Sequence, residues 1–345
     1  MKKKLKAAFL VAAKLCGGFA LARYLTRNGI VIIGWHGISI EDEHRRFPFY
    51  FVSQQTLQRR IEFLKRHYTV ISLNEAMEMH ASGKIKPRHC VLTFDDGLYD
   101  FTAAGVPVMK KQNVTGTLYV LSAKMQNALA HKFASKDIVL RAQERRGGSS
   151  TIVESQYHKQ LAEQQQKLAD ASEEDRYPLL REFAKEFDVD FEPVLEKRVW
   201  NHHRPDELKQ LVDDGFDVQV HTHTHKTVVE HPDTVYEEAA TCRELLEATT
   251  GQPATDFCYP SGLWEHASWE PLRRAGMRGA VTCKTGPNFA DTPALALRRY
   301  VDHNENTQLE FEAYASGFNW LLNVLFKPSR YFSPSIALDE GPPYF

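Results

Sequence analysis

The chain has 345 residues, of which 43% are hydrophobic, 11% aromatic and 25% charged. This length suits one barrel of the (β/α) type, and a formal net charge of -1 gives no support for nucleic acid or an anionic surface as the main partner. The five cysteines form neither a CxxC pair nor a disulfide framework, which fits a reducing compartment.

The N-terminal residues 1–28 bear on where the protein resides. A run of lysines at 2–4 precedes two short apolar stretches, which Lys14 separates. A signal peptide has such a basic start, and Ala20-Leu21-Ala22 resembles a cleavage site, yet neither stretch approaches the ~20 residues needed to span a membrane. We expect one amphipathic helix, lying on a membrane or docked on the barrel. This favours a cytoplasmic or peripheral inner-membrane location, with export as the alternative.

The next residues alternate between strand and helix signals. Residues 30–38 read as a core strand containing His36, which could line a site or be a structural histidine. Ser53 can cap a helix that carries apolar residues at helical spacing. Residues 68–73 read as a strand and 74–81 as a helix. This alternation predicts a parallel sheet with outer helices.

A buried strand then ends in two adjacent carboxylates. The β-formers of Val91–Phe94 run directly into Asp95, Asp96 and Gly97. Open α/β folds and barrels bind ligands at this edge of the sheet, and a chain that buries two neighbouring carboxylates generally supplies a metal, a proton or a cation. An ordinary strand end with an Asp-Gly turn is the alternative.

Residues 131–200 depart from the alternation. Glutamines and charged residues dominate, while apolar residues keep a helical spacing, and Gly147-Gly148-Ser149-Ser150 reads as a flexible joint. We expect a mostly helical insertion, joined to the barrel on both sides. It would serve as a substrate-selecting lid or partner surface, or merely as a spacer.

A second strand candidate, Phe216–Val220, runs into His221, His223 and His225. Imidazoles and a carboxylate are the ligands expected for zinc or a similar divalent ion, and three protein ligands leave a position open for water. A surface histidine run or an adventitious nickel-type site is the alternative.

The C-terminal part returns to short helices and strands. We expect helices at 206–212, 235–249 and 269–275 and a strand at 279–282. The apolar segment Phe318–Phe326 is too short to span a membrane and should pack on the barrel or on the N-terminal helix.

Taken together, these motifs resemble the polysaccharide deacetylase family, also called the NodB-homology or carbohydrate esterase 4 family. Thr93–Gly97 matches its TFDDG motif, His221 and His225 match its His-x3-His motif, and Phe257–Gly262 resembles a variant of its third motif. The likeness covers roughly residues 30–130 and 204–303. It implies an α/β fold, a distorted (β/α) barrel of about seven parallel strands.

The domain organisation follows from this resemblance. Residues 29–345 would form the catalytic domain with its insertion at about 131–200, and residues 1–28 an added helix.

The resemblance also implies a metal centre and a base. Asp96, His221 and His225 would hold a divalent ion, with Zn2+ expected first and Co2+ or Ni2+ as alternatives. Asp95 would take the proton of an activated water that attacks an acetamido carbonyl. The spacing of the family's motif leaves His223 outside the ligand set.

Three further residues complete the implied machinery. The backbone N–H of Ser261 would stabilise the oxyanion, and His303 is the nearest match to the family's general acid, although its surroundings fit poorly. Many members carry an arginine where Cys258 stands. Here Arg299 is the natural substitute, because it can hold Asp95 ionised through a bidentate contact, and Cys258 is expected to be a small buried residue rather than a nucleophile.

The implied function is metal-dependent hydrolysis of N-acetyl groups on a polysaccharide or glycolipid. An O-acetyl esterase is one alternative, since the same oxyanion chemistry serves esters. A carbohydrate-binding pseudoenzyme is another, although it would tend to have lost the ligands that this chain keeps. The expected partner is an N-acetylated glycan, with peripheral membrane contact and no nucleic acid.

Overall fold

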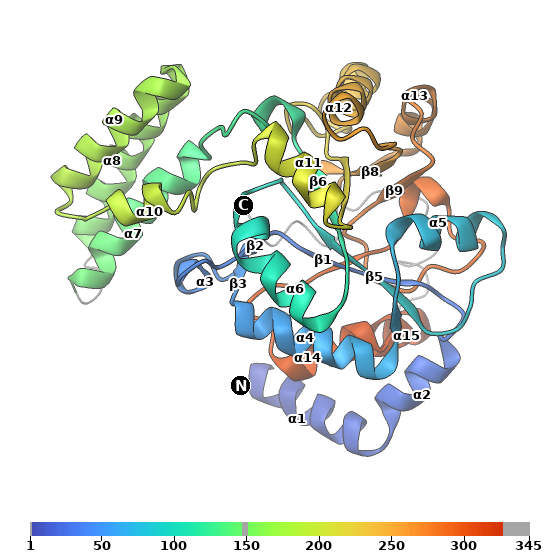
Figure 1. Ribbon diagram of the computed structural model, residues 1–345. Coiled ribbons are helices and arrows are strands. Elements are labelled where there is room, and N and C mark those ends of the chain that lie inside the picture. Colours follow the sequence, from blue (N-terminus) through green and yellow to red (C-terminus); the bar gives the residue numbers. More distant parts are fainter. Residues whose placement is uncertain (1, 147–150, 327–345) are drawn as a thin grey trace.

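A parallel β-sheet forms the centre of the computed structural model, which describes residues 2–146 and 151–326 (Figure 1). Its strands are β1 (Val31–Trp35), β4 (Thr69–Val70), β5 (His89–Phe94), β6 (Thr117–Val120), β7 (Asp217–Val220), β8 (Asp256–Cys258), β9 (Gly279–Val281) and β10 (Tyr300–Val301). They run in the order β10-β1-β5-β6-β7-β8-β9, and β4 pairs with the start of β5. The predicted parallel sheet is confirmed.

The sheet curves toward closure between its two edge strands. Past β9, a parallel bridge joins Val281 to Leu297, and the chain then enters β10, which pairs with β1. A separate pair of short strands, β2 (Gly37–Ile38) and β3 (Phe51–Val52), lies beyond the end of β1. This arrangement is the distorted barrel that the sequence predicts.

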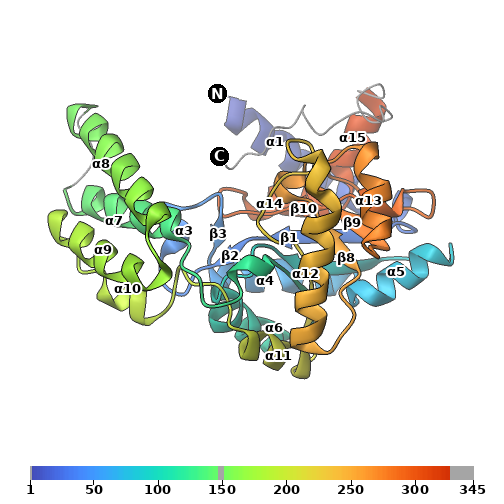
Figure 2. The ribbon, with the colours of Figure 1, turned by 90° about the horizontal axis from the view of Figure 1, so that it is seen from above.

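Helices surround the strands, as the view from above shows (Figure 2). They include α4 (Gln54–His67), α5 (Leu73–Ala81), α6 (Val106–Gln112), α11 (Pro205–Asp213), α12 (Val235–Thr250) and α13 (Trp269–Arg274). Ser53 caps α4 as predicted, since its Oγ accepts a hydrogen bond from the Thr56 N–H at 3.1 Å. The predicted strand at 68–73 is shorter than expected, because the Ser72 hydroxyl caps α5 and starts that helix at Leu73.

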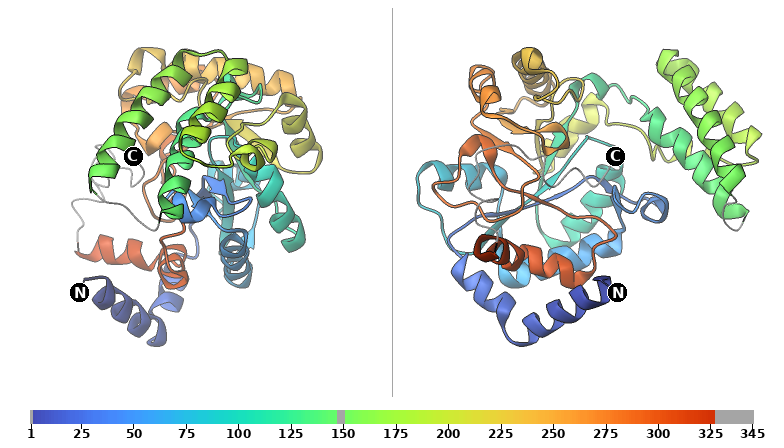
Figure 3. Two further views of the ribbon diagram at one scale, coloured as in Figure 1. Left: turned by 90° about the vertical axis from the view of Figure 1, so that its left-hand side faces the viewer. Right: turned by 180° about the vertical axis from the view of Figure 1, so that it is seen from behind.

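The insertion is helical and projects from the barrel (Figures 1 and 3). It contains α7 (His131–Arg145), α8 (Thr151–Asp170), α9 (Glu173–Glu186) and α10 (Glu192–Glu196). The joint predicted at 147–150 lies outside the described residues. The insertion has its own apolar core, which continues onto Phe47, Phe51 and Trp200 beside the barrel.

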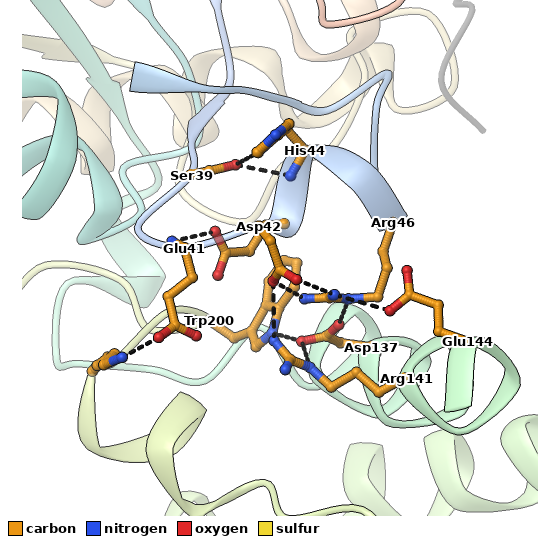
Figure 4. Close-up of polar contacts among 11 residues, drawn as sticks. Ser39, Glu41, Asp42, His44, Arg46, Asp137, Arg141, Glu144 and Trp200 are labelled. Atoms are coloured by element: carbon orange, nitrogen blue, oxygen red, sulfur yellow. Dashed lines mark hydrogen bonds and ion pairs between the residues drawn. The ribbon is translucent and has the colours of Figure 1, made fainter. Parts of the chain in front are cut away.

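A buried carboxylate fastens the insertion to the short helix α3 (Glu43–Arg46) (Figure 4). Asp137 on α7 accepts hydrogen bonds from Arg46 Nε at 2.5 Å, Arg141 Nε at 3.1 Å and Trp200 Nε1 at 3.2 Å. Its side chain is fully buried, and that of Arg46 is 2% exposed. The Arg46 guanidinium also contacts Asp42 at 2.7 Å and the exposed Glu144 at 3.3 Å. The insertion is therefore attached through a paired buried charge.

The N-terminal residues form two helices where the sequence predicts one. They are α1 (Lys2–Leu15) and α2 (Gly18–Leu25), and they meet at 71° because Gly17 adopts a left-handed φ of 78°. They pack against α14 (Gln308–Ala315) and α15 (Phe318–Phe326) at one edge of the molecule (Figure 1). No single described helix has the length and hydropathy to cross a membrane, although α1 and α2 taken together do by length and composition.

We predict that Asp137→Ala destabilises the protein by about 3 kcal/mol in urea unfolding, because Arg46 loses its buried partner. This value is at the low end for breaking a buried pair, since Asp42 still contacts Arg46. The control is Glu144→Ala, which removes a half-exposed partner of the same guanidinium and should cost less than about 1 kcal/mol. Equal losses would mean that the buried carboxylate does not fasten the insertion.

Candidate active site

Polar side chains gather at the C-terminal edge of the sheet. Because the strands are parallel, the segments that follow them meet at this edge. Asp95 and Asp96 follow β5, His221 follows β7, and Ser261 lies shortly after β8. The fold therefore brings together motifs that lie far apart in the sequence.

Three side chains at this edge form a group suited to a metal. The ligand atoms of Asp96, His221 and His225 all lie within 4.8 Å of one another. Asp96 Oδ1 is 3.2 Å from His221 Nε2 and 3.7 Å from His225 Nε2. One carboxylate and two imidazoles are the donor set that zinc and similar divalent ions prefer, so the residues fit such an ion.

A backbone carbonyl fixes the tautomer of His221. Its Nδ1 lies 2.9 Å from the carbonyl oxygen of Cys258. A carbonyl oxygen can only accept, so Nδ1 carries a proton, and Nε2, which faces Asp96, is the nitrogen that would bind a metal. The third motif thus orients a ligand contributed by the second.

His225 is held by the local backbone. Its φ of 70° lies in the left-handed region, and its N–H donates to Thr222 Oγ1 at 2.9 Å. Burial, assisted by the neighbouring His221, lowers the pKa of His225 to about 4. The imidazole is therefore neutral near pH 7, the form that can bind a metal.

Asp95 faces a guanidinium. Arg299 Nη1 donates to Asp95 Oδ1 at 2.6 Å, and Arg299 Nη2 donates to Oδ2 at 2.8 Å; both side chains are buried. Burial is the largest single influence and would raise the pKa of Asp95, but the charge and hydrogen bonds of Arg299, together with the charges of His36 and His221, outweigh it and lower that pKa. Gly34 on β1 leaves room for the pair, because a Cβ there would lie 3.1–3.2 Å from the Arg299 side chain.

Cys258 contacts both Arg299 and Asp95. Its Sγ lies 3.2 Å from Arg299 Nη2 and 3.6 Å from Asp95 Oδ1. Asp95, His221 and Cys258 also cluster closely enough for a metal. However, burial raises the pKa of the Cys258 thiol, and both oxygens of Asp95 are engaged by Arg299. The group around Asp96 therefore fits a metal better.

Backbone strain concentrates at this edge. Of the nine described non-glycine residues with positive φ, four belong to the loops of the site: Asp96, Thr222, His225 and Ser261. Such conformations cost of order 1–3 kcal/mol each and tend to mark functional sites. Ser261, at φ 57° and ψ 10°, is one of them.

Tyr50 is a member of the site that sequence reasoning missed. Its hydroxyl donates to Asp96 Oδ2, while Asp96 Oδ1 faces the two histidines. Burial, and then the charge of Asp96, raise the pKa of Tyr50, so the hydroxyl remains a donor. Its ring centroid lies 4.7 Å from that of Phe133 on the insertion. Tyr50 sits in an aromatic run that reads as core, so no signal in the sequence marks it.

Three other histidines that the sequence analysis considers, His36, His223 and His303, lie outside the group formed by Asp96, His221 and His225. His223 Nδ1 lies 2.8 Å from Ser122 Oγ, and His223 is not in the group around Asp96. His303 follows β10 and packs against the half-exposed Phe49, with ring centroids 5.2 Å apart. His36 lies nearer the carboxylates, its Nε2 3.8 Å from Asp95 Oδ2. His36 therefore lies beside Asp95, and His303 lies beside Phe49, the residue before Tyr50.

Comparison with known proteins bears on this geometry. A family model described as polysaccharide deacetylase matches residues 82–280. No curated protein sequence matches the chain significantly.

Solved structures share the fold at low sequence identity. The Streptococcus pyogenes deacetylase PplD is 16% identical, with 84% of this chain and 99% of that chain covered and a TM-score of 0.57. IcaB from Ammonifex degensii is 16% identical (84% and 97% covered, TM-score 0.54). A de-N-acetylase from Aggregatibacter actinomycetemcomitans is 12% identical (83% and 99% covered, TM-score 0.55).

We predict that Tyr50→Phe weakens zinc affinity by about 10–100-fold, because the hydrogen bond that orients Asp96 is lost. Competition with a fluorescent zinc indicator would measure the change. The matched control is Tyr236→Phe, at an exposed tyrosine on α12, which should keep the wild-type affinity. Unchanged affinity in Tyr50→Phe would show that the tyrosine does not support the metal group.

Proposed function

Because the chain belongs to the polysaccharide deacetylase family, it is a hydrolase that deacetylates polysaccharide, and we propose that it removes acetyl groups from nitrogen with the help of a divalent metal. One observation carries the proposal: a metal-compatible group, Asp96, His221 and His225, lies beside Asp95, which a buried arginine engages. An N-acetylated glycan is the first substrate to test, since one solved structure with this fold is described as a de-N-acetylase.

The metal group and the base have separate supports. Asp96, His221 and His225 would hold the ion, Zn2+ being the first choice for these donors and Co2+ or Ni2+ the alternatives. When bound, such an ion supplies Lewis acidity to the acetyl carbonyl and lowers the pKa of water to near ~7. The residues around the ion would then transfer the protons and stabilise the negative charge that develops on the carbonyl oxygen.

We assign the base to Asp95. Arg299 occupies one acceptor site on each carboxylate oxygen and the Cys258 thiol donates to Oδ1, so Oδ2 is the oxygen that keeps a lone pair for a proton. The guanidinium keeps Asp95 ionised, so the carboxylate can accept the proton of the attacking water as the water adds to the carbonyl carbon.

We assign the oxyanion contact to the backbone N–H of Ser261. The residue lies in the loop after β8, the strand whose last carbonyl orients His221. Its left-handed conformation, rare for a residue with a side chain, supports a role for its backbone rather than its hydroxyl.

The leaving amine requires a proton, and two histidines can supply it. His303 holds the place of the family's acid in chain order, and its contact with Phe49, the residue before Tyr50, supports this assignment. The 3.8 Å between His36 and Asp95 supports His36 as the second candidate. Collapse of the tetrahedral intermediate would break the C–N bond as this proton reaches nitrogen.

One test of this proposal separates the roles of the two carboxylates, Asp95 and Asp96. Asp96→Asn should lose bound metal, because a neutral oxygen replaces a charged donor. Asp95→Asn should keep its metal while acetate release from N-acetylated oligosaccharides falls by roughly 100-fold or more, since the amide accepts no proton. His221→Ala and His225→Ala should resemble Asp96→Asn, and His223→Ala serves as the metal-retaining control.

Metal per chain and acetate release would be measured together on each variant. Metal loss in Asp95→Asn with retention in Asp96→Asn would mean that the two roles are exchanged. An O-acetyl esterase would instead release acetate from O-acetylated oligosaccharides and leave the N-acetylated ones intact. Removing the metal with a chelator should abolish activity, and adding Zn2+ should restore it.

A further prediction concerns the general acid that protonates the leaving amine. Loss of the acid should slow amide hydrolysis about 100-fold or more but spare nitrophenyl acetate, whose leaving group needs no proton. We expect this selective loss in His303→Gln or in His36→Gln. The ratio of the two rates is the measurement. If both variants slow both substrates equally, neither histidine is the acid.

A further inference from the structure

Two half-exposed lysines of helix α1, Lys6 and Lys14, reach back to the protein. Lys6 and Lys14 contact Glu310 at 2.7 Å and Glu312 at 2.5 Å, both on α14. Leu10, at the midpoint between the two lysines, is 3% exposed. Residues 6, 10 and 14 are spaced by four and therefore share one side of the helix. Two ion pairs and the buried Leu10 therefore attach this inner side of α1 to the rest of the protein.

The opposite side of α1 is apolar and exposed. Positions 5, 8, 12 and 15 fall on this side at helical spacing and carry Leu, Ala, Ala and Leu. Leu5 is 66% exposed and Leu15 is 82% exposed, and Phe9 at the flank is 53% exposed. A helix on the surface of a water-soluble domain has the reverse arrangement, with its apolar stripe toward the core.

The exposed apolar side of α1 continues onto two neighbouring helices. Nine of the twelve large exposed apolar residues in the described chain lie on α1, α2 and α15, and we call these nine the outer apolar face: Leu5, Phe9, Val11, Leu15, Leu21, Tyr24, Leu25, Leu325 and Phe326. Phe318 joins the three helices, with ring centroids 6.1 Å from Phe9 and 5.1 Å from Phe19. Seen from behind, α1 and α2 occupy one edge of the molecule beside α14 and α15 (Figure 3).

Charge and composition indicate what covers this face. Lysines at 2–4 begin α1, and Arg27 follows α2, so cations stand at both ends of the helix pair. Apolar side chains flanked by cations are the pattern of helices that lie at a membrane surface containing anionic lipid. In addition, α1 and α2 together have the length and composition of a membrane segment but are bent by 71°. A pair bent in this way is suited to lying in the headgroup region.

We propose that the outer apolar face inserts into the headgroup region of an anionic membrane, with α1 and α2 lying along its surface and the barrel held against it. The ion pairs of Lys6 and Lys14 with α14 keep the apolar side turned outward. Lipid, rather than a core, then covers these side chains. The proposal is independent of the reaction at the site.

Flotation of the full-length, metal-loaded protein with vesicles tests this proposal. Vesicles of phosphatidylcholine mixed with phosphatidylglycerol should bind the protein, and pure phosphatidylcholine should bind it more weakly, as should high salt. The double variant Leu5→Gln with Leu15→Gln should reduce binding by at least about tenfold, because two large apolar side chains no longer enter the lipid.

Matched variants make the result specific. Leu245→Gln, at a leucine 41% exposed on α12, should bind vesicles as the wild type does. Unaltered thermal melting and acetate release from a soluble substrate would show that the double variant folds. If it does not fold, the pair Leu325→Gln and Phe326→Gln on α15 tests the other end of the face and should also lose binding.

Four outcomes would overturn the proposal. They are no vesicle binding by the wild type, undiminished binding by the folded double variants, a wild-type dimer that these substitutions turn into monomers without any vesicle binding, and cleavage of the chain near Ala22 in cells. The third outcome would assign the face to a second copy, and the fourth would identify the segment as a signal peptide.

Discussion

The buried ion pair between Arg299 and Asp95 is the interaction on which the arrangement of the site depends. Two adjacent carboxylates at one strand end repel each other, and burial strengthens that repulsion. The bidentate guanidinium neutralises Asp95 and leaves the charge of Asp96 directed at two imidazoles. Because of this pair, the two neighbouring aspartates can take different roles. Asp96 belongs to the group suited to a metal, and Asp95 lies outside that group, paired with Arg299.

Much of this centre could be predicted because its chemistry is written in short motifs. A strand that ends in Asp95 and Asp96, and another that ends in His221, must meet at one edge once the sheet is parallel. Arg299 could be selected because a missing arginine at position 258 left one carboxylate without a cation. The meeting of the motifs follows from strand direction and residue type, whereas the choice of Arg299 also needs the family resemblance, which places an arginine at position 258.

The features that sequence reasoning missed depend on contacts between distant segments. Helical-wheel reasoning places lysines toward water, but Lys14 meets Glu312, almost the whole chain away. The break at Gly17 did have a signal, the Gly17-Gly18 pair, which the prediction of a single helix did not use. Tyr50 reads as core because its aromatic neighbours do, and only the tertiary structure brings its hydroxyl to Asp96. Its ring also touches Phe133, so the insertion is in contact with a residue that supports the proposed metal group.

The missing side chain at Gly34 has a consequence for how this family can vary. Arg299 reaches Asp95 across the space above Gly34, where a Cβ would crowd its guanidinium. A relative with arginine in place of Cys258 would deliver the cation from β8, and the space above position 34 would then be needed only if an arginine also stood at position 299. The positions equivalent to 34, 258 and 299 therefore form a linked set. Exchange at one of them changes what the other two can accommodate, so we expect them to covary among relatives.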